Sequence, residues 1–192
     1  MTKTPEIIDN FLPWEVFSNF AYAAMNSPHF STADYTSSPM ESDGSMETFG
    51  KQLSTNQNLA ECMAQAILYR RHINDQQLSD FYIRYEWIVQ LIKEKLDIKK
   101  LYMLRLNCTF GQKERHQGIY HTDMRGDYYD EHCKIAILYL NSNNGGTQFE
   151  DGPFVQSEAN RIVIAPSKLM HAGVWQTNAK CRYVLNINYE PK

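Results

Sequence analysis

Several common sequence signals are scarce or missing in this chain of 192 residues. Its four cysteines lie far apart with no C-x-x-C pair, so neither a disulfide framework nor a thiolate zinc site is indicated, and we expect a reducing, cytoplasmic location. No run of about 18 consecutive apolar residues occurs, and the first residues lack a basic segment followed by an apolar one. We therefore expect neither a membrane span nor export by a signal peptide.

An excess of positive charge is also lacking, because the formal net charge is -3 at pH 7. Such a chain has no field that would gather nucleic acid or anionic lipid over its whole surface, so neither is an expected partner. With 43% hydrophobic and 12% aromatic residues it can bury one good core. We predict one domain spanning residues 1–192, and the oligomeric state stays open.

The first hundred residues favour helices. Pro13 stands where a first helical residue is preferred, and apolar residues at helical spacing then predict a helix over 13–26. A second helix is predicted from Asn58 to Arg71, where positive charge suits a helix C-terminus. A third is predicted over 79–96, because one apolar stripe is formed by Phe81, Tyr85, Ile88, Ile92 and Leu96. Residues 1–100 are thus predicted to be a helical support.

The stretch 27–50 is rich in small polar residues and turn formers, which predicts a long surface loop with at most one short strand. Loops of this length in compact domains are often binding loops or lids. A loop without a role is an equally good interpretation.

From Leu101 onward the pattern changes to short β-branched or aromatic runs separated by turn residues. The candidate strands are Leu101–Phe110, Ile119–Asp123, Cys133–Leu140, Thr147–Glu150, Arg161–Ala165, His171–Trp175 and Cys181–Tyr189. Short strands at this density predict a sandwich or barrel. The fold class is therefore α+β, mainly β, with the N-terminal helices packed on one face of the sheet formed within 101–190.

Three residues carry a candidate metal site. His121 and Asp123 are two positions apart in a predicted strand, so their side chains share a face, with Cα atoms about 6.6 Å apart. His171 begins a later predicted strand that a jelly-roll connection could bring beside them. Two imidazoles and one carboxylate with open positions are the ligand set of non-haem Fe(II) oxygenases. A zinc hydrolase with the same ligands plus water, or a metal-binding jelly roll without oxidation chemistry, remains an alternative.

Arg182 is the fourth notable residue, on the strand that follows His171 across a predicted hairpin turn. An arginine facing an apolar interior must find an anion, and its planar fork suits a carboxylate bound through two hydrogen bonds. No protein carboxylate is obvious nearby, so a ligand carboxylate is the expected partner. The alternatives without oxidation chemistry leave Arg182 without a purpose.

At these residues the sequence resembles the 2-oxoglutarate and Fe(II)-dependent dioxygenases, and within them the prolyl-4-hydroxylase-like branch. The resemblance covers nearly all of 101–190 and includes the opening segment 7–13, which resembles that of small stand-alone members, some carried by bacteriophages. The motifs are Tyr120-His121-Thr122-Asp123, Ala136-Ile137-Leu138-Tyr139-Leu140-Asn141 with Gly145-Gly146-Thr147-Gln148-Phe149, Asn160-Arg161-Ile162-Val163-Ile164 before His171, and Arg182-Tyr183-Val184.

The resemblance implies a double-stranded β-helix, a jelly roll of the cupin kind, that holds Fe(II) on His121, Asp123 and His171. It implies 2-oxoglutarate bound to the metal, with Arg182 gripping the far carboxylate. Tyr139 occupies a position from which a hydroxyl often shares that carboxylate, although a buried core tyrosine with a satisfied hydroxyl is an equal alternative. Oxygen is the implied second co-substrate, and ascorbate is a reductant worth testing.

The resemblance further implies hydroxylation of a peptidyl residue, with proline favoured, in a peptide or protein partner. A small-molecule hydroxylase acting on an amino acid or metabolite by the same mechanism is the second hypothesis, since fold does not decide substrate. The DNA-repair demethylases are a poorer match, because no second arginine follows Arg182 and the chain lacks a basic excess.

Overall fold

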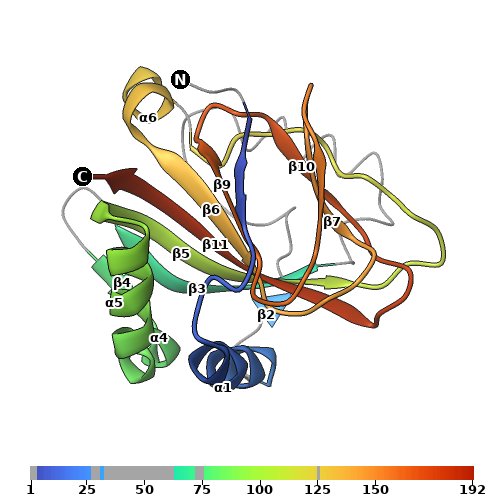
Figure 1. Cartoon of the computed structure of the whole chain (residues 1–192), viewed down its shortest axis with the longest axis horizontal. Helices are drawn as coiled ribbons and strands as arrows, with labels where there is room; N and C mark the ends of the chain where they lie inside the picture. Colours follow the sequence, from blue (N-terminus) through green and yellow to red (C-terminus); the bar gives the residue numbers. More distant parts are fainter. Residues whose placement is uncertain (1–3, 27–30, 33–62, 72–75, 125) are drawn as a thin grey trace.

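The computed structural model describes residues 4–26, 31–32, 63–71, 76–124 and 126–192 (Figure 1). The helices are α1 (Trp14–Met25), α4 (Asp80–Arg84), α5 (Glu86–Lys95) and α6 (Asp127–His132). The strands are β1 (Glu6–Ile8), β2 (Ser31–Thr32), β3 (Met63–Arg71), β4 (Gln76–Leu78), β5 (Ile98–Phe110), β6 (Lys134–Tyr139), β7 (Gly146–Phe149), β8 (Phe154–Gln156), β9 (Ile162–Pro166), β10 (His171–Val174) and β11 (Cys181–Pro191). Within these residues no helix has both the length and the apolar character needed to cross a membrane.

Two antiparallel sheets form the body of the molecule. The major sheet has the strand order β1-β9-β6-β11-β5-β3-β2, with β4 added beside β3, and the minor sheet has the order β10-β7-β8. In Figure 1 the minor sheet lies beside the major one, with the long strands β5 and β11 running through the centre. This is the predicted mainly-β α+β class, and it corresponds to the jelly roll of a double-stranded β-helix.

Side chains along the central strands point alternately to the two faces of the major sheet, and they form two separate hydrophobic cores. One set of side chains, including Leu106, Leu138 and Leu185, packs with the helices on the outer face of the major sheet. The other set, including Ile137, lies between the two sheets. Successive side chains in a strand point to opposite faces, so this division follows directly from the sequence. In Figure 1, α1, α4 and α5 gather on one side of the sheet, which confirms the predicted helical layer.

Most predicted elements are confirmed. The predicted helix 13–26 is α1, and the predicted helix 79–96 is the α4–α5 pair, interrupted at Tyr85. Ser79 caps α4 by accepting a hydrogen bond from the Tyr82 amide. Strands were found where expected for β5, β6, β7, β9, β10 and β11, within a few residues at each end.

The predicted helix 58–71 is wrong over its described part, because Met63–Arg71 form β3. Its run of Met, Ala, Gln and Leu has good intrinsic helix propensity. Pairing with the long strand β5 overrides that preference, since β5 would otherwise present an unpaired edge. Of the predicted loop 27–50, only Ser31–Thr32 is described, as the short strand β2, and the rest lies outside the described residues.

The predicted strand Ile119–Asp123 is also wrong as a regular strand. The segment makes only isolated bridges with β10, at Gln117 with Val174 and at His121 with His171. One more residue lies between the two bridges on this segment than on β10, so the ladder carries an extra residue, as in a β-bulge. Asp123 lies in a bend beyond the second bridge.

Candidate metal centre

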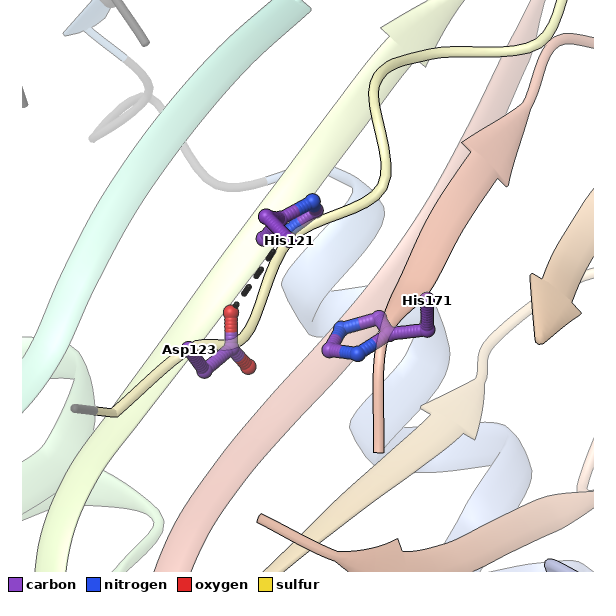
Figure 2. Close-up of side chains that lie close together, drawn as sticks. All are labelled: His121, Asp123 and His171. Carbon is purple, nitrogen blue, oxygen red and sulfur yellow. Dashed lines mark ion pairs between the residues drawn. The ribbon is translucent and has the colours of Figure 1, made fainter. Parts of the chain in front are cut away.

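The structure brings the three predicted ligands together. His121 and Asp123 come from the irregular segment before α6, and His171 is the first residue of β10. One ligand atom from each residue lies within 4.8 Å of the others. Figure 2 shows both imidazoles and the carboxylate converging, with the ion pair between His121 and Asp123 dashed. Residues 119–123 do not form the regular strand from which the pairing of His121 with Asp123 was predicted, yet the two side chains still lie close together.

Backbone pairing fixes the two histidines relative to each other. The His121 amide donates to the His171 carbonyl at 3.0 Å, and the His171 amide donates to the His121 carbonyl at 3.0 Å. Such a doubly hydrogen-bonded antiparallel pair holds its Cα atoms about 5.5 Å apart. The ring centroids are accordingly 4.7 Å apart. The two imidazoles therefore face one point in space before any ion binds.

Each imidazole is also held in one tautomer by a local contact. Nδ1 of His121 lies 3.0 Å from the Ile119 carbonyl, and Nδ1 of His171 lies 3.1 Å from the Leu169 carbonyl. A carbonyl can only accept, so each Nδ1 carries the hydrogen and each Nε2 carries the lone pair that a metal needs. Burial lowers the pKa of His121, which favours the neutral, ligating form.

Asp123 completes the donor set with a buried carboxylate, whose side chain is only 3% exposed. Burial acts to raise its pKa, but the charge of Arg105, with the two histidines, outweighs burial and holds the pKa below its usual value. Nη2 of Arg105 lies 3.5 Å from Oδ1, whereas Oδ2 has no hydrogen-bond partner among the described residues. An ionised, buried oxygen without a partner is costly unless a cation binds it.

The residues present therefore fit a divalent transition metal. Two neutral imidazole nitrogens and one carboxylate oxygen form a mixed donor set of the kind that binds non-haem iron. No other group of three potential ligands of this kind occurs among the residues that the structure describes.

Arg182 lies on β11, on the inner face of the major sheet, and is only 5% exposed. Its Nη1 donates to the Gly146 carbonyl at 2.9 Å, and its Nε donates to the Thr109 hydroxyl at 3.3 Å. In the described part of the chain no carboxylate pairs with it and no acceptor meets Nη2. Burial lowers its pKa, as expected for a desolvated cation. In the structure, as the sequence predicted, Arg182 therefore lacks an anionic partner from the described part of the protein.

Tyr139 is fully buried on the same inner face, one strand away from Arg182. Its hydroxyl lies 2.8 Å from the Thr147 hydroxyl and 3.2 Å from the Val155 carbonyl, each within hydrogen-bonding distance. Burial raises the pKa of Tyr139 despite the nearby positive charge of Arg182. A role in co-substrate binding stays a prediction, because the hydroxyl already has partners within the protein.

Sequence reasoning missed four polar residues on this face. Arg105 and Asn107 lie on β5, and Asn186 and Asn188 lie on β11. The signal was available, because Asn186 and Asn188 follow Arg182 at even spacings and must share its face in a regular strand.

Comparisons with known proteins identify the fold. A scan against protein-family models found no match, and a search of curated proteins found none either. Among solved structures, a Pseudomonas putida prolyl-4-hydroxylase is similar, with TM-score 0.58 and 13% identity over 98% of this chain and 93% of that one. A Trichoplax adhaerens prolyl hydroxylase, in complex with a hypoxia inducible factor peptide fragment, has TM-score 0.59 and 15% identity over 98% and 84%.

A third similar structure is SnoN, a non-heme alpha ketoglutarate dependent epimerase from nogalamycin biosynthesis. Its TM-score is 0.61 at 10% identity, over 97% of this chain and 77% of that chain. At such identities the likeness concerns the fold. The chain thus has the fold of 2-oxoglutarate and Fe(II)-dependent oxygenases, and the His-x-Asp and His residues meet within it.

Proposed function

We propose that this chain is an Fe(II)- and 2-oxoglutarate-dependent hydroxylase. The observation that carries the proposal is the combination of a three-ligand site with a buried arginine that has no carboxylate partner among the described residues. With Fe(II) and 2-oxoglutarate bound, reaction with O2 would convert 2-oxoglutarate to succinate and CO2 and would insert one oxygen atom into a substrate C–H bond. A zinc hydrolase would need the same three ligands but would leave Arg182 without a role.

The protein's own contribution is geometric and electrostatic. His121, Asp123 and His171 would hold the metal through two Nε2 atoms and the carboxylate, whose lowered pKa keeps it ionised at neutral pH. Arg182 would bind the distal carboxylate of 2-oxoglutarate, using the Nη2 hydrogens that no described residue accepts. Tyr139 would assist only if its hydroxyl turned from its present partners toward that carboxylate.

For the substrate, we propose a peptidyl residue, with proline tested first. The support is the similarity to two prolyl hydroxylase structures, one of them in complex with a peptide fragment. A small molecule such as an amino acid is the second candidate, and the polar inner face around Arg105 favours it. We also propose a cytoplasmic location, which the free thiols of the three described cysteines support.

The test is an anaerobic titration of the metal-free protein with Fe(II) and 2-oxoglutarate. A weak visible charge-transfer band is expected for the chelate, and His121→Ala and Asp123→Ala should abolish it. Absence of the band, or a band indifferent to both substitutions, would overturn the oxygenase proposal. His116→Ala is the matched control, because its side chain is exposed and outside the site.

Substrate class is tested by succinate release in air, with ascorbate present to keep the iron reduced. Stimulation by proline-containing peptides would support the peptidyl proposal. Stimulation by free amino acids alone would replace it with the small-molecule candidate.

A further inference from the structure

The inner face of the major sheet carries an unusual group of amides beside the metal centre. Asn107, Asn186 and Asn188 are 7%, 9% and 2% exposed. The Oδ1 atom of each is buried without a hydrogen-bond partner, as is Nε of Arg105. We refer to these four residues as the amide–arginine cluster.

The register of the strands places the members of this cluster together. Asn186 pairs directly with Arg105 across the β11–β5 ladder, and Asn107 lies two residues further along β5 on the same face. Side chains opposite each other in such a ladder have Cβ atoms about 4.5–5.5 Å apart. Asn188 lies two residues beyond Asn186 on that face. Because Arg105 also approaches Asp123, the cluster borders the three-ligand site.

Other buried asparagines in the same protein show what a structural role requires. Asn160 is 1% exposed, and its carboxamide accepts from the Leu12 amide and donates to the Leu12 carbonyl. Asn143 is 4% exposed, and its Oδ1 accepts from the Gly145 amide. Buried polar groups in native proteins are nearly always paired in this way. Three unpaired carbonyl oxygens on one face therefore indicate that donors reach them from outside the protein.

The balance of charge at the site also points to an external ligand. The guanidinium groups of Arg105 and Arg182 and the carboxylate of Asp123 share the space between the sheets. If a divalent ion and the doubly charged 2-oxoglutarate occupy the site, Asp123 faces the ion and Arg182 faces the co-substrate. One positive charge, that of Arg105, then remains without a counter-ion. The Arg105 side chain is 22% exposed, so a ligand can reach it, and a guanidinium best matches a carboxylate.

We propose that the amide–arginine cluster is the substrate-recognition site and that it binds a carboxylate flanked by N–H donors. Arg105 binds the carboxylate, and the asparagine oxygens accept hydrogen bonds from the ammonium or amide nitrogen. This inference rests on the proposed function. The chemistry can be presented by a free amino acid, by the C-terminal residue of a peptide, or by an acidic side chain within a peptide.

The experiment measures binding rather than turnover. The protein is loaded anaerobically with Fe(II) and 2-oxoglutarate, and calorimetry follows the addition of three compound series. These are the free L-amino acids, their N-acetyl derivatives, and N-acetyl amino-acid amides that include those of aspartate and glutamate. We expect binding by compounds that keep a carboxylate, and a loss of at least about tenfold in affinity when that group is converted to an amide.

Variants locate the interaction. Arg105→Gln should weaken carboxylate binding by at least about tenfold, and Asn186→Asp should do the same by placing a negative charge opposite Arg105. Arg105→Lys should recover part of the affinity, because it keeps the charge but loses the planar fork. Arg84→Gln is the control, since that side chain is exposed on α4.

The outcomes separate this inference from the proposed function. If the charge-transfer band forms but no carboxylate compound binds, or if Arg105→Gln and Asn186→Asp bind as the wild type does, the cluster is not the recognition site. If the band itself fails to form, the proposed function is wrong. The compound series that binds identifies the source of the carboxylate.

Discussion

Arg182 combines near-complete burial with purely neutral partners, the Gly146 carbonyl and the Thr109 hydroxyl. Neutral acceptors orient a guanidinium without neutralising it, so the residue is held ready for an anion. Its position is also tightly limited. A Cβ atom on Gly173 would lie 3.2 Å from Nη2, so a larger residue there would require the guanidinium to shift by a few tenths of an ångström.

We predict that Arg182→Ala weakens 2-oxoglutarate binding by at least about tenfold while leaving metal content nearly intact, because Arg182 is not a metal ligand. Calorimetric titration of the metal-loaded variant measures the affinity, and elemental analysis measures the metal. Arg182→Lys should be intermediate, since it retains the charge. Loss of the metal from the alanine variant would show that the role assigned to Arg182 is wrong.

At this scale, the His-x-Asp spacing and the later His171 were enough to select three residues that the structure brings together, whereas their role as metal ligands stays a prediction. The amide–arginine cluster was only partly visible in the sequence, because the even spacing along β11 puts Asn186 and Asn188 on the face of Arg182 but does not show that this face is buried. Asparagine and arginine are usually surface residues, and only the register shows that Asn186 and Arg105 are opposite each other on a buried face. Burial without a partner is a property of the fold, and a sequence does not display it.

Among the elements, α6 is joined to the major sheet through Glu190 near the end of β11. The buried Glu190 carboxylate accepts hydrogen bonds from Tyr128 of α6, from Tyr102 of β5 and from Lys99. Tyr129 packs edge-on against Tyr102, with ring centroids 5.4 Å apart. These contacts fix the helix that directly follows the segment carrying His121 and Asp123.

The hydrogen bonds of Glu190 should make the stability of the fold depend on pH. Hydrogen bonds, first from Lys99 and then from Tyr128, lower the pKa of Glu190 from 4.5 to about 2. Because the folded pKa is below the unfolded one, the carboxylate stabilises the fold above about pH 4.5, and this stabilisation is lost as the pH falls toward 2. Glu190→Gln should therefore be less stable than the wild type at pH 6, and the gap should close between pH 4.5 and 2.

Urea unfolding midpoints at several pH values measure that gap. Glu94→Gln on the exposed face of α5 is the control and should show little difference at any pH. A gap for Glu190→Gln that stays constant down to pH 2 would contradict the assigned hydrogen bonds.

The elements that sequence analysis predicted well have helical periodicity, as in α1, or are apolar and β-branched runs between turn residues, as in β6 and β11. The failures have specific causes. β3 has the composition of a helix, and pairing with β5 on one side and with β2 and β4 on the other holds it as a strand. The segment 119–123 has residue types that are common in strands, but one extra residue lies between its bridges with β10, at Gln117 and at His121. Helix α6 was missed because, with 6 residues and no buried side chain, it presents no apolar stripe.

At the scale of the whole molecule, the metal centre would connect segments that are distant in sequence. An ion bound to His121, Asp123 and His171 would tie the irregular segment to β10. A ligand that binds only the folded state stabilises it by about 2.7 kcal/mol at a hundredfold excess over its Kd. For a chain of this size that corresponds to a rise in Tm of about 5–10 °C.

We therefore expect Mn(II) or Zn(II) to raise the Tm of the metal-free protein by that amount, and EDTA to reverse the change. Differential scanning calorimetry is the measurement. His171→Ala should respond much less, whereas the exposed His116→Ala should respond as the wild type does. An equal response in His171→Ala would mean that the ion binds elsewhere.

The overall architecture was predicted from the density of short strands in the second half and from the helical periodicity in the first. The pairing order was not, because β1 joins β9 and β11 lies between β5 and β6, which are contacts between distant parts of the chain. Local patterns indicate which face of a strand is apolar. They do not indicate which strand lies beside it.

The central position of β11 also limits which mutations could change the substrate of this protein. Its 11 residues carry Arg182, then Asn186 and Asn188, with the last about 20 Å along the strand from the first. Deleting one residue between them would turn every later side chain to the opposite face. Replacing Asn186 or Asn188 would leave Arg182 in place. Evolution and protein engineering alike are therefore expected to reach new substrates by substitution within β11, at constant length, with Arg182 retained.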